Sequence, residues 1–360
     1  MHGVQGLRMM ERRRICELWE RGDASALVTL VRVEGSSYRR VGARLLIAAN
    51  GDYAGSVSGG CLEAEVVRKA QWLVRDRRAV VERYSTLFDD TAEIPYGLGC
   101  GGTVDLLIER TDTPECVALM QAMQASLRGE QRRVVTWLPQ GNAMLRREIS
   151  DDNDTAIFCS EKMSPAHAEA FAECLDAPQR LIVIGAGDDA QPMVRMAALL
   201  GWSVTVIDGR AQWARAERFP EAERVMVTST LDGIDVRERD AVVVMTHSYE
   251  QDRAWLVVVL PKAPRYLGLL GARHRSALLV SEAAAMLEWP VERACEGLFA
   301  PVGLDLGGDG AEAIALATVA EVQACCEGKL GASRRMTPKM VAEQIAEGGA
   351  SRYLQTQCAL

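Results

Sequence analysis

Residues 181–190 read LIVIGAGDDA, and this stretch decides the fold of the second half of the chain. The unbroken apolar run at its start is typical of a strand buried on both faces of a parallel sheet. The glycine turn that follows opens a helical pattern through Leu200, and the next apolar strand, Val204–Ile207, ends at Asp208. Strand, glycine turn, helix, strand and acidic residue in this order predict a Rossmann-like, doubly wound parallel sheet.

Each residue type in the glycine turn carries its own expectation. Gly185 would make the tight turn, Gly187 would admit a phosphate beside the helix N-terminus, and Asp208 would accept a hydrogen bond from a ribose hydroxyl. Asp188 and Asp189, however, place negative charge where a pyrophosphate would bind, which argues against tight NAD binding. The pattern therefore predicts the fold and leaves nucleotide binding open.

Later segments extend the same fold. Further strands are predicted at Ala241–Met245 and Arg265–Leu269, and a last helix at Glu312–Cys326. His247 lies just beyond the carboxyl end of the first of these strands, where open α/β sheets bind their ligands. We expect a Rossmann-like domain over residues 180–328 and an appended polar tail over residues 329–360.

The first half of the chain predicts a mixed α+β domain over residues 1–150. Apolar spacing indicates one helix over residues 8–21 and another that begins after Gly60. Strands are predicted at Ala26–Val33, Arg44–Ala49, Tyr53–Val57, Val80–Tyr84 and Val104–Ile108. Acidic turn residues and a helical segment over Pro165–Leu175 indicate a linker over residues 151–179.

Two cysteines lie within glycine-rich clusters. Cys61 stands in SGGCLE, residues 58–63, and Cys100 in GLGCGG, residues 97–102. Glycine permits positive φ and close backbone approach, so a thiol between glycines is arranged to be reached by a ligand rather than packed in a core. A helix N-terminus at Cys61 would also stabilise a thiolate and bind anions through its free amides. Both clusters therefore predict a ligand site.

The composition excludes several classes of function. The 360 residues carry a net charge of −8 without a long basic block, so neither nucleic acid nor an anionic membrane is an expected partner. The apolar runs fall short of the about 20 residues that span a bilayer, and the start of the chain lacks a signal-peptide pattern, which predicts a cytoplasmic protein. Ten cysteines without a Cys-x-x-Cys pair do not form a zinc framework. Core or helix packing is expected for Cys16, Cys116, Cys159, Cys174 and Cys295.

With these motifs in view, the chain resembles the XdhC/CoxI family of molybdenum-hydroxylase maturation factors, from about Gly35 to Glu327. The resemblance is carried by GSSYRR (35–40) with GAR (42–44), GSVSGGCLE (55–63), GLGCGG (97–102), GW (201–202) with DGR (208–210), TH (246–247), GLLG (268–271) and APVGLD (300–305). The family commonly has a histidine where this chain has Asp188, so this position departs from the pattern.

The resemblance implies a cofactor chaperone rather than an enzyme. Such a protein protects the molybdenum cofactor, either molybdopterin or its cytosine dinucleotide form, and supports its sulfuration together with a cysteine desulfurase. It then inserts the cofactor into a xanthine- or carbon-monoxide-dehydrogenase-like apoenzyme. By the same resemblance Cys61 is the leading thiol for the molybdenum and Cys100 the second, and we expect a homo-oligomer.

The chemistry of the residues agrees with this cargo. Molybdopterin carries a soft metal dithiolene and an anionic phosphate, so a thiolate could address the metal while amides and the guanidinium groups of Arg39, Arg40 and Arg44 hold the phosphate. Glu63 could orient the site or simply oppose the dipole of its helix. The candidate cofactor contacts are Ser58, Gly59, Gly60, Cys61, Glu63, Gly99, Cys100, Gly101, Gly102, Arg39, Arg44, Gly185, Gly187, Asp208 and His247, with a nucleotide as a second candidate ligand of the Rossmann half.

Two alternative functions stay open at this point. The segment from Gly185 to Asp208 is also compatible with an NAD(P)-dependent oxidoreductase. A redox-responsive scaffold is the other alternative, in which Cys61 and Cys100 form a reversible disulfide, and this requires their Cα atoms to lie within about 7 Å of each other.

Overall fold

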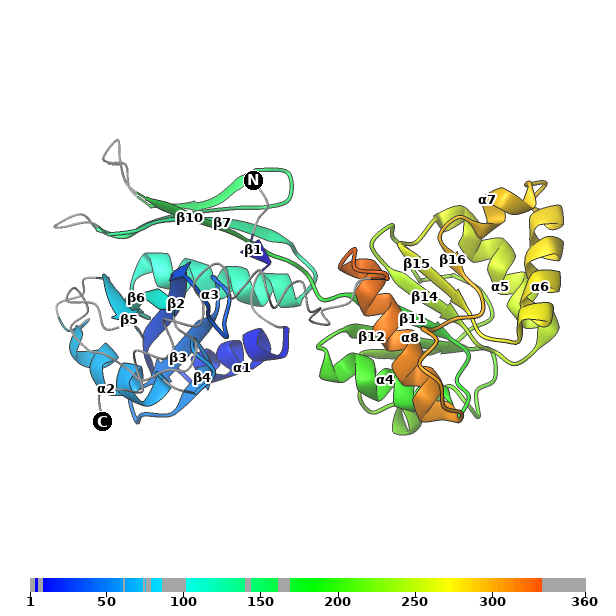
Figure 1. The fold of residues 1–360 in the computed structure, drawn as a ribbon, viewed down its shortest axis with the longest axis horizontal. Helices are drawn as coiled ribbons and strands as arrows, with labels where there is room; N and C mark the ends of the chain where they lie inside the picture. The colour runs from blue at the N-terminus through cyan, green and yellow to red at the C-terminus, as the bar shows by residue number, and fades with distance from the viewer. Residues whose placement is uncertain are drawn as a thin grey trace, which may run out of the picture. The chain divides into compact units, whose positions relative to one another are not determined.

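The computed structural model describes residues 4–5, 9–60, 62–73, 75, 79–85, 102–139, 144–160 and 169–331. The contacts among them divide the chain into two units, one ending at Ala177 and the other beginning at Pro178 (Figure 1). Among the helices of these residues, none is long and apolar enough to cross a membrane.

The first unit contains a five-stranded antiparallel sheet with the strand order β4-β3-β2-β6-β5. Its strands are β2 (Ala24–Glu34), β3 (Arg44–Ala48), β4 (Tyr53–Gly55), β5 (Val80–Ser85) and β6 (Thr103–Arg110). Helix α2 (Glu63–Leu73) covers one face through Leu62, Val66 and Ala70, which pack on Val28, Leu45 and Leu106 among others. All five predicted strands and the helix after Gly60 are thus confirmed.

A second sheet completes this unit, with the order β1-β10-β7-β8-β9. Its strands are β1 (Val4–Gln5), β7 (Arg132–Trp137), β8 (Arg146–Ser150), β9 (Ala156–Cys159) and β10 (Ala170–Leu175). Helices α1 (Met9–Glu20) and α3 (Pro114–Leu127) share a core with residues of both sheets, and α3 lies between the two sheets in Figure 1. The predicted linker over residues 151–179 is wrong at residues 156–159 and 170–175, which form β9 and β10 of this sheet.

The predicted helix over Pro165–Leu175 is also wrong over its described part. Residues 170–175 form β10, where Phe171, Glu173 and Leu175 are buried and alternate with more exposed residues. This is the period of a strand and not of a helix. Pairing with β7 and the burial of the Glu173 carboxylate decide the conformation.

The second unit is a six-stranded parallel sheet with the order β13-β12-β11-β14-β15-β16. In chain order this is 3-2-1-4-5-6, the order of the Rossmann fold. The strands are β11 (Arg180–Ile184), β12 (Ser203–Asp208), β13 (Arg224–Val227), β14 (Ala241–Val244), β15 (Tyr266–Leu269) and β16 (Leu298–Phe299). The Rossmann-like prediction is confirmed.

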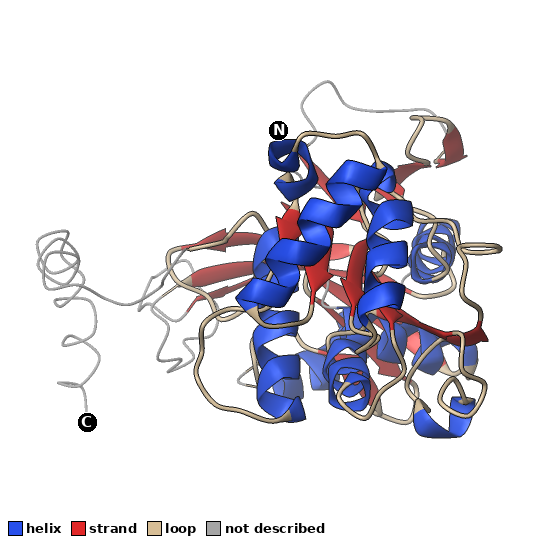
Figure 2. Ribbon diagram, turned by 90° about the vertical axis from the view of Figure 1, so that its right-hand side faces the viewer, coloured by secondary structure: helices blue, strands red, loops and turns tan. Residues whose placement is uncertain are grey.

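Helices cover both faces of the parallel sheet (Figures 1 and 2). On one face α4 (Ala190–Leu199) and α8 (Ala311–Cys326) pack on β11, β12 and β14. On the other lie α5 (Tyr249–Val259), α6 (Arg273–Met286) and α7 (Val291–Cys295). Because both faces are covered, residues 181–184 of β11 and all four residues of β14 are apolar and buried.

A buried ion pair joins the two sheets of the first unit. Arg147 on β8 donates to both oxygens of Glu109 on β6, at 2.9 and 3.0 Å, and both side chains are at most 2% exposed. The same guanidinium donates to Thr136 Oγ1 and to the Glu115 carbonyl, so its donors find several acceptors. Burial disfavours the charged form, but Glu109 outweighs it and the pKa of Arg147 is raised.

We predict that Glu109→Gln lowers the free energy of unfolding of the first unit by about 3–5 kcal/mol, because it leaves the Arg147 charge buried without a counter-ion. The matched control is Asp154→Asn, which removes the exposed Arg133–Asp154 pair and changes stability by less than about 1 kcal/mol. Urea unfolding followed by circular dichroism measures both. Equal effects of the two substitutions would contradict the assigned role of the buried pair.

Candidate functional site

Three connections leave the first sheet at the same edge. The register pairs Glu34 with Thr103 and Ser85 with Thr103, while Leu45 pairs with Gly55. Strands β2, β4 and β5 therefore end, and β3 and β6 begin, at this edge. Glu34 and Thr103 lie opposite each other there, and Gly55 lies toward the same edge but level with Val28 of β2.

Close contacts between glycines and the loop of residues 35–40 confirm this convergence. A Cβ atom on Gly102 would lie 2.1 Å from the Ser36 carbonyl oxygen, so a glycine is required there. Gly59 has φ +94°, and its Cβ position lies 3.6 Å from Tyr38 Cβ. The structure thus brings together described parts of the GSSYRR, SGGCLE and GLGCGG motifs.

The Glu63 carboxylate organises the loop of residues 56–60. Its Oε1 accepts hydrogen bonds from Ser56 Oγ at 2.7 Å, Val57 N at 3.0 Å and Ser58 N at 2.9 Å. Its Oε2 accepts from Gly60 N at 2.9 Å and from Ser58 Oγ. Two further amides donate within the loop, Gly59 N to Ser56 Oγ and Leu62 N to Ser58 Oγ.

These contacts bear on the expectation that free amides at the start of this helix bind an anion. The amides of Ser58 and Gly60 donate to the Glu63 carboxylate, and the amide of Gly59 donates to Ser56 Oγ. Gly59 and Gly60 are nevertheless exposed, so a ligand can still contact the outer surface of the loop. Glu63 faces the loop backbone and is 4% exposed, so its carboxylate is directed at the protein.

The hydrogen bonds also set the ionisation of Glu63. Burial by itself raises the pKa of this carboxyl, but the hydroxyl groups of Ser58 and Ser56 and the backbone amides outweigh burial and lower the pKa to about 2. The carboxylate therefore remains ionised far below the pH at which a free glutamate is protonated.

We predict that Glu63 stabilises the fold above pH 4.5 and that this contribution is lost as the pH falls toward 2. The sign follows because its pKa is lower in the folded protein than the ordinary value of 4.5. Urea unfolding from about pH 7 to about pH 3 should show wild type more stable than Glu63→Gln, with a difference that shrinks below pH 4.5. A difference that does not depend on pH would argue against this ionisation.

The three arginines expected at the cofactor phosphate have different surroundings. Arg44 is 1% exposed and pairs with Glu173 on β10, so its burial contradicts the expected ligand contact. Arg39 pairs with Glu11 of α1 and is mostly buried. Arg40 is exposed and has no ion-pair partner among the described residues, so of the three it is best placed to meet an anion.

Several predicted site residues lie outside the described residues, namely Cys61, Gly99, Cys100 and Gly101. Their predicted roles at a ligand and at molybdenum therefore stay predictions. In the described part of the chain no three His, Cys, Asp or Glu side chains are grouped to hold a metal ion. Of the other cysteines, Cys16 and Cys116 are buried as expected, whereas Cys159 and Cys295 are exposed and the packing prediction is wrong for them.

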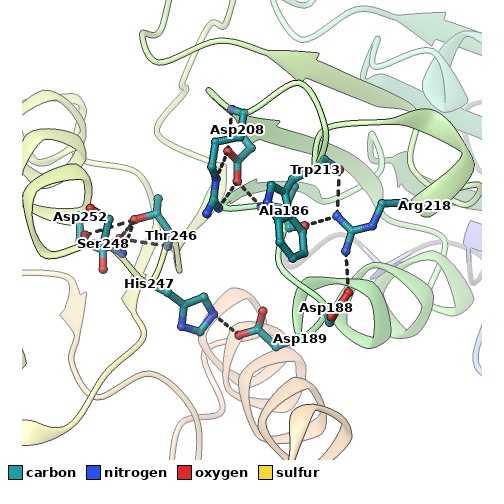
Figure 3. Close-up of polar contacts among 11 residues, drawn as sticks. Ala186, Asp188, Asp189, Asp208, Trp213, Arg218, Thr246, His247, Ser248 and Asp252 are labelled. Carbon is teal, nitrogen blue, oxygen red and sulfur yellow. Dashed lines mark hydrogen bonds and ion pairs between the residues drawn. The ribbon is translucent and has the colours of Figure 1, made fainter.

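The second candidate site lies at the carboxyl ends of β11 and β14 (Figure 3). From β11 the chain proceeds to β12 and β13 on one side and returns to β14 on the other, so this is the switch point where Rossmann folds bind ligands. Gly185 has φ +119°, and a Cβ there would lie 2.3 Å from the Met245 carbonyl oxygen. The expected tight turn at Gly185 is confirmed.

Asp208 is occupied by contacts within the chain. One carboxylate oxygen accepts from Arg210 N and Nε, both at 2.9 Å, and the other from Ala186 N at 2.9 Å and Arg210 Nη2 at 2.7 Å (Figure 3). Burial raises the pKa of Asp208, but the Arg210 contact and the amides outweigh it and lower the pKa. Both oxygens already accept two hydrogen bonds, which leaves poor geometry for the expected ribose hydroxyl.

Each aspartate of the acidic pair after the glycine turn contacts a side chain from a later segment of the chain. Asp188 pairs with Arg218 at 2.6 Å, and Arg218 also donates to the Ala186 and Trp213 carbonyls. Asp189 meets His247 Nε2 at 2.8 Å, and its other oxygen lies 2.6 Å from the Cβ position of Gly187 (Figure 3). A carboxylate therefore stands where Gly187 was expected to admit a phosphate.

Sequence reasoning missed the residues that hold this arrangement. Thr246 donates hydrogen bonds from its backbone N and from Oγ1 to the carboxylate of the buried Asp252. This carboxylate also accepts a hydrogen bond from Arg275 Nη2 at 2.7 Å. These contacts fix the turn in which His247 adopts φ +62°. The position of Asp252 in the first turn of a helix could have indicated its role. No sequence signal indicates the role of Arg218, because it lies 32 residues from the glycine turn that it contacts.

We predict that NADH and NADPH show no saturable binding up to about 1 mM, because a phosphate near Gly187 would meet the Asp189 carboxylate and Asp208 is already bound by Arg210. Fluorescence titration of the purified full chain measures this, with a known dehydrogenase as the positive control. Saturation at micromolar dinucleotide would overturn this account of the crevice.

Fold and site define the chain as a two-unit protein that combines a glycine-rich loop cluster with a Rossmann unit. The family described as "XdhC and CoxI family" matches residues 18–85, and the "XdhC Rossmann domain" matches residues 181–322. The chain belongs to the XdhC and CoxI family, as its motifs predicted.

Relatives with similar sequences span both units. A Bacillus subtilis protein named as a probable xanthine dehydrogenase component is 27% identical over 85% of this chain and 94% of its own length. The "Molybdenum cofactor insertion chaperone PaoD" of Escherichia coli is 26% identical over 84% of this chain and 83% of its own. A crystal structure titled as a xanthine dehydrogenase from Bacillus halodurans is 27% identical, covers 92% of this chain and 99% of its own, and has a TM-score of 0.76.

Proposed function

We propose that this protein is a chaperone that binds the molybdenum cofactor, protects it, supports its sulfuration and inserts it into a molybdenum hydroxylase related to xanthine or carbon monoxide dehydrogenase. Family membership and the relative named as a molybdenum cofactor insertion chaperone support the proposal. The structural observation that carries it is the contact of the GSSYRR loop with described glycines of both glycine-rich motifs at one edge of the first sheet.

The loop edge suits a cargo with a soft metal and an anionic phosphate. Cys61 and Cys100 are the proposed thiolate ligands of the molybdenum, because soft metals favour sulfur donors. The exposed Arg40 is the proposed contact of the phosphate, in place of the buried Arg44. Gly59 and Gly60 are exposed and keep side chains away from this surface.

The remaining parts of the proposal concern partners. Sulfuration requires a sulfur donor, and we propose a cysteine desulfurase for this step, with a molybdenum hydroxylase apoenzyme as the recipient and a homo-oligomer as the working form. The cofactor is proposed as molybdopterin or its cytosine dinucleotide. We do not assign a nucleotide to the Rossmann unit, because Asp208 and Gly187 already contact Arg210 and Asp189.

We predict that the chain purified from cofactor-producing cells carries a pterin whose oxidised form fluoresces, together with molybdenum. Cys61→Ala should lose both, because the proposed metal ligand is gone. The matched control is Cys159→Ala, which removes an exposed thiol on β9 and should keep the wild-type amounts. Fluorescence after oxidation and elemental analysis provide the two readouts.

The outcomes separate the parts of the proposal. A wild-type chain without pterin would refute the cofactor chaperone. Equal pterin in wild type and Cys61→Ala would remove Cys61 from its role and leave the chaperone in place.

A further inference from the structure

We propose that Glu63 is the positioning residue of the cofactor loop: its buried carboxylate takes the loop's hydrogen-bond donors and so fixes how the segment around Cys61 is presented to the cofactor. This inference rests on the proposed function. It gives Glu63 a role different from direct contact with the cofactor, because its two oxygens are turned toward the chain.

The contacts reach both sequence neighbours of Cys61. On one side Gly60 N donates directly to Glu63 Oε2 at 2.9 Å. On the other, Leu62 N donates to Ser58 Oγ at 2.9 Å, and that hydroxyl itself donates to Glu63 Oε2. One carboxylate therefore anchors the chain immediately before and, through Ser58, immediately after position 61.

The site requires a carboxylate and not an amide. All five groups that contact Glu63 are donors, three backbone N–H groups and two hydroxyls. An ionised carboxylate only accepts, whereas a glutamine would turn an NH2 group toward some of these donors. Because the side chain is 4% exposed, water does not readily replace a lost partner.

A neighbouring glutamate shows that this arrangement is not a general property of the helix start. Glu65 also lies in the first turn of α2, where the helix dipole stabilises the negative charge of either glutamate. Its carboxylate, however, pairs with Arg68 and with Lys69 at 2.8 Å on the helix itself. Glu63 alone of the two contacts the loop, so the pair provides a matched control.

The backbone of the loop leaves its outer side open. Gly59 and Gly60 both have positive φ, +94° and +116°, and a Cβ on Gly60 would meet no described atom within 4 Å. The loop thus turns its donors inward to Glu63 and presents bare backbone outward. This arrangement leaves Gly60 open to the approach of a large cofactor.

The test compares Glu63→Gln with Glu65→Gln in the full chain from cofactor-producing cells. Pterin per chain should fall at least about tenfold for Glu63→Gln and stay near wild type for Glu65→Gln, since residues that orient ligands typically contribute this much. The second readout is the pH profile of Cys61 alkylation by iodoacetamide, followed by mass spectrometry, which should shift for Glu63→Gln alone. Circular dichroism checks that each variant folds.

The possible results separate the inference from the proposed function. Equal pterin and equal alkylation profiles for the two variants would overturn the inference. Absence of pterin in wild type would refute the proposed function, while the alkylation profile would still test the role of Glu63. Should Glu63→Gln fail to fold, Ser58→Ala replaces it, because it removes only the link between Glu63 and Leu62; an unchanged pterin content in that variant would likewise count against the inference.

Discussion

The glycine-containing loops of both units depend on one kind of interaction, a largely buried carboxylate of the chain that accepts hydrogen bonds from backbone amides. In the first unit Glu63 accepts from Val57, Ser58 and Gly60. In the second, Asp208 accepts from Ala186 and Arg210, and Asp252 accepts from Thr246. A buried carboxylate is stable only when several donors form hydrogen bonds with it. The loop conformation therefore depends on the carboxylate, and the ionised carboxylate depends on the donors of the loop.

The same constraint has opposite consequences in the two units. Around Glu63 the donors are drawn inward and the outer side of the loop stays open at Gly59 and Gly60. In the second unit Arg210 donates hydrogen bonds to both carboxylate oxygens of Asp208, and the Asp189 carboxylate lies next to Gly187. The first arrangement leaves the outer surface of the loop open, and the second fills the place where a Rossmann fold ordinarily receives a phosphate.

The sequence predicted elements whose own composition decides their conformation. Residues 181–184 of β11 are apolar because both faces of the sheet are covered, and the five strands of the first sheet follow local patterns. The helix predicted in place of strand β10 was wrong because the conformation there depends on pairing with β7 and on a buried ion pair. The expectation that Arg44 contacts the ligand failed for the same reason. Its ion-pair partner Glu173 lies 129 residues away, so the local sequence does not indicate the pair.

The second unit shows how a fold can be kept while its usual ligand site is changed. Gly185 still makes the tight turn against Met245, and the strand order is still that of a Rossmann fold. Yet the charges that a bound pyrophosphate would supply are supplied by Asp188 and Asp189, with Arg218 and His247 as their partners. Because Asp188 contacts Arg218 and Asp189 contacts His247, contacts within the chain hold the glycine turn. Fold and fingerprint therefore identify the architecture, and the contacts of the individual side chains decide what the site can bind.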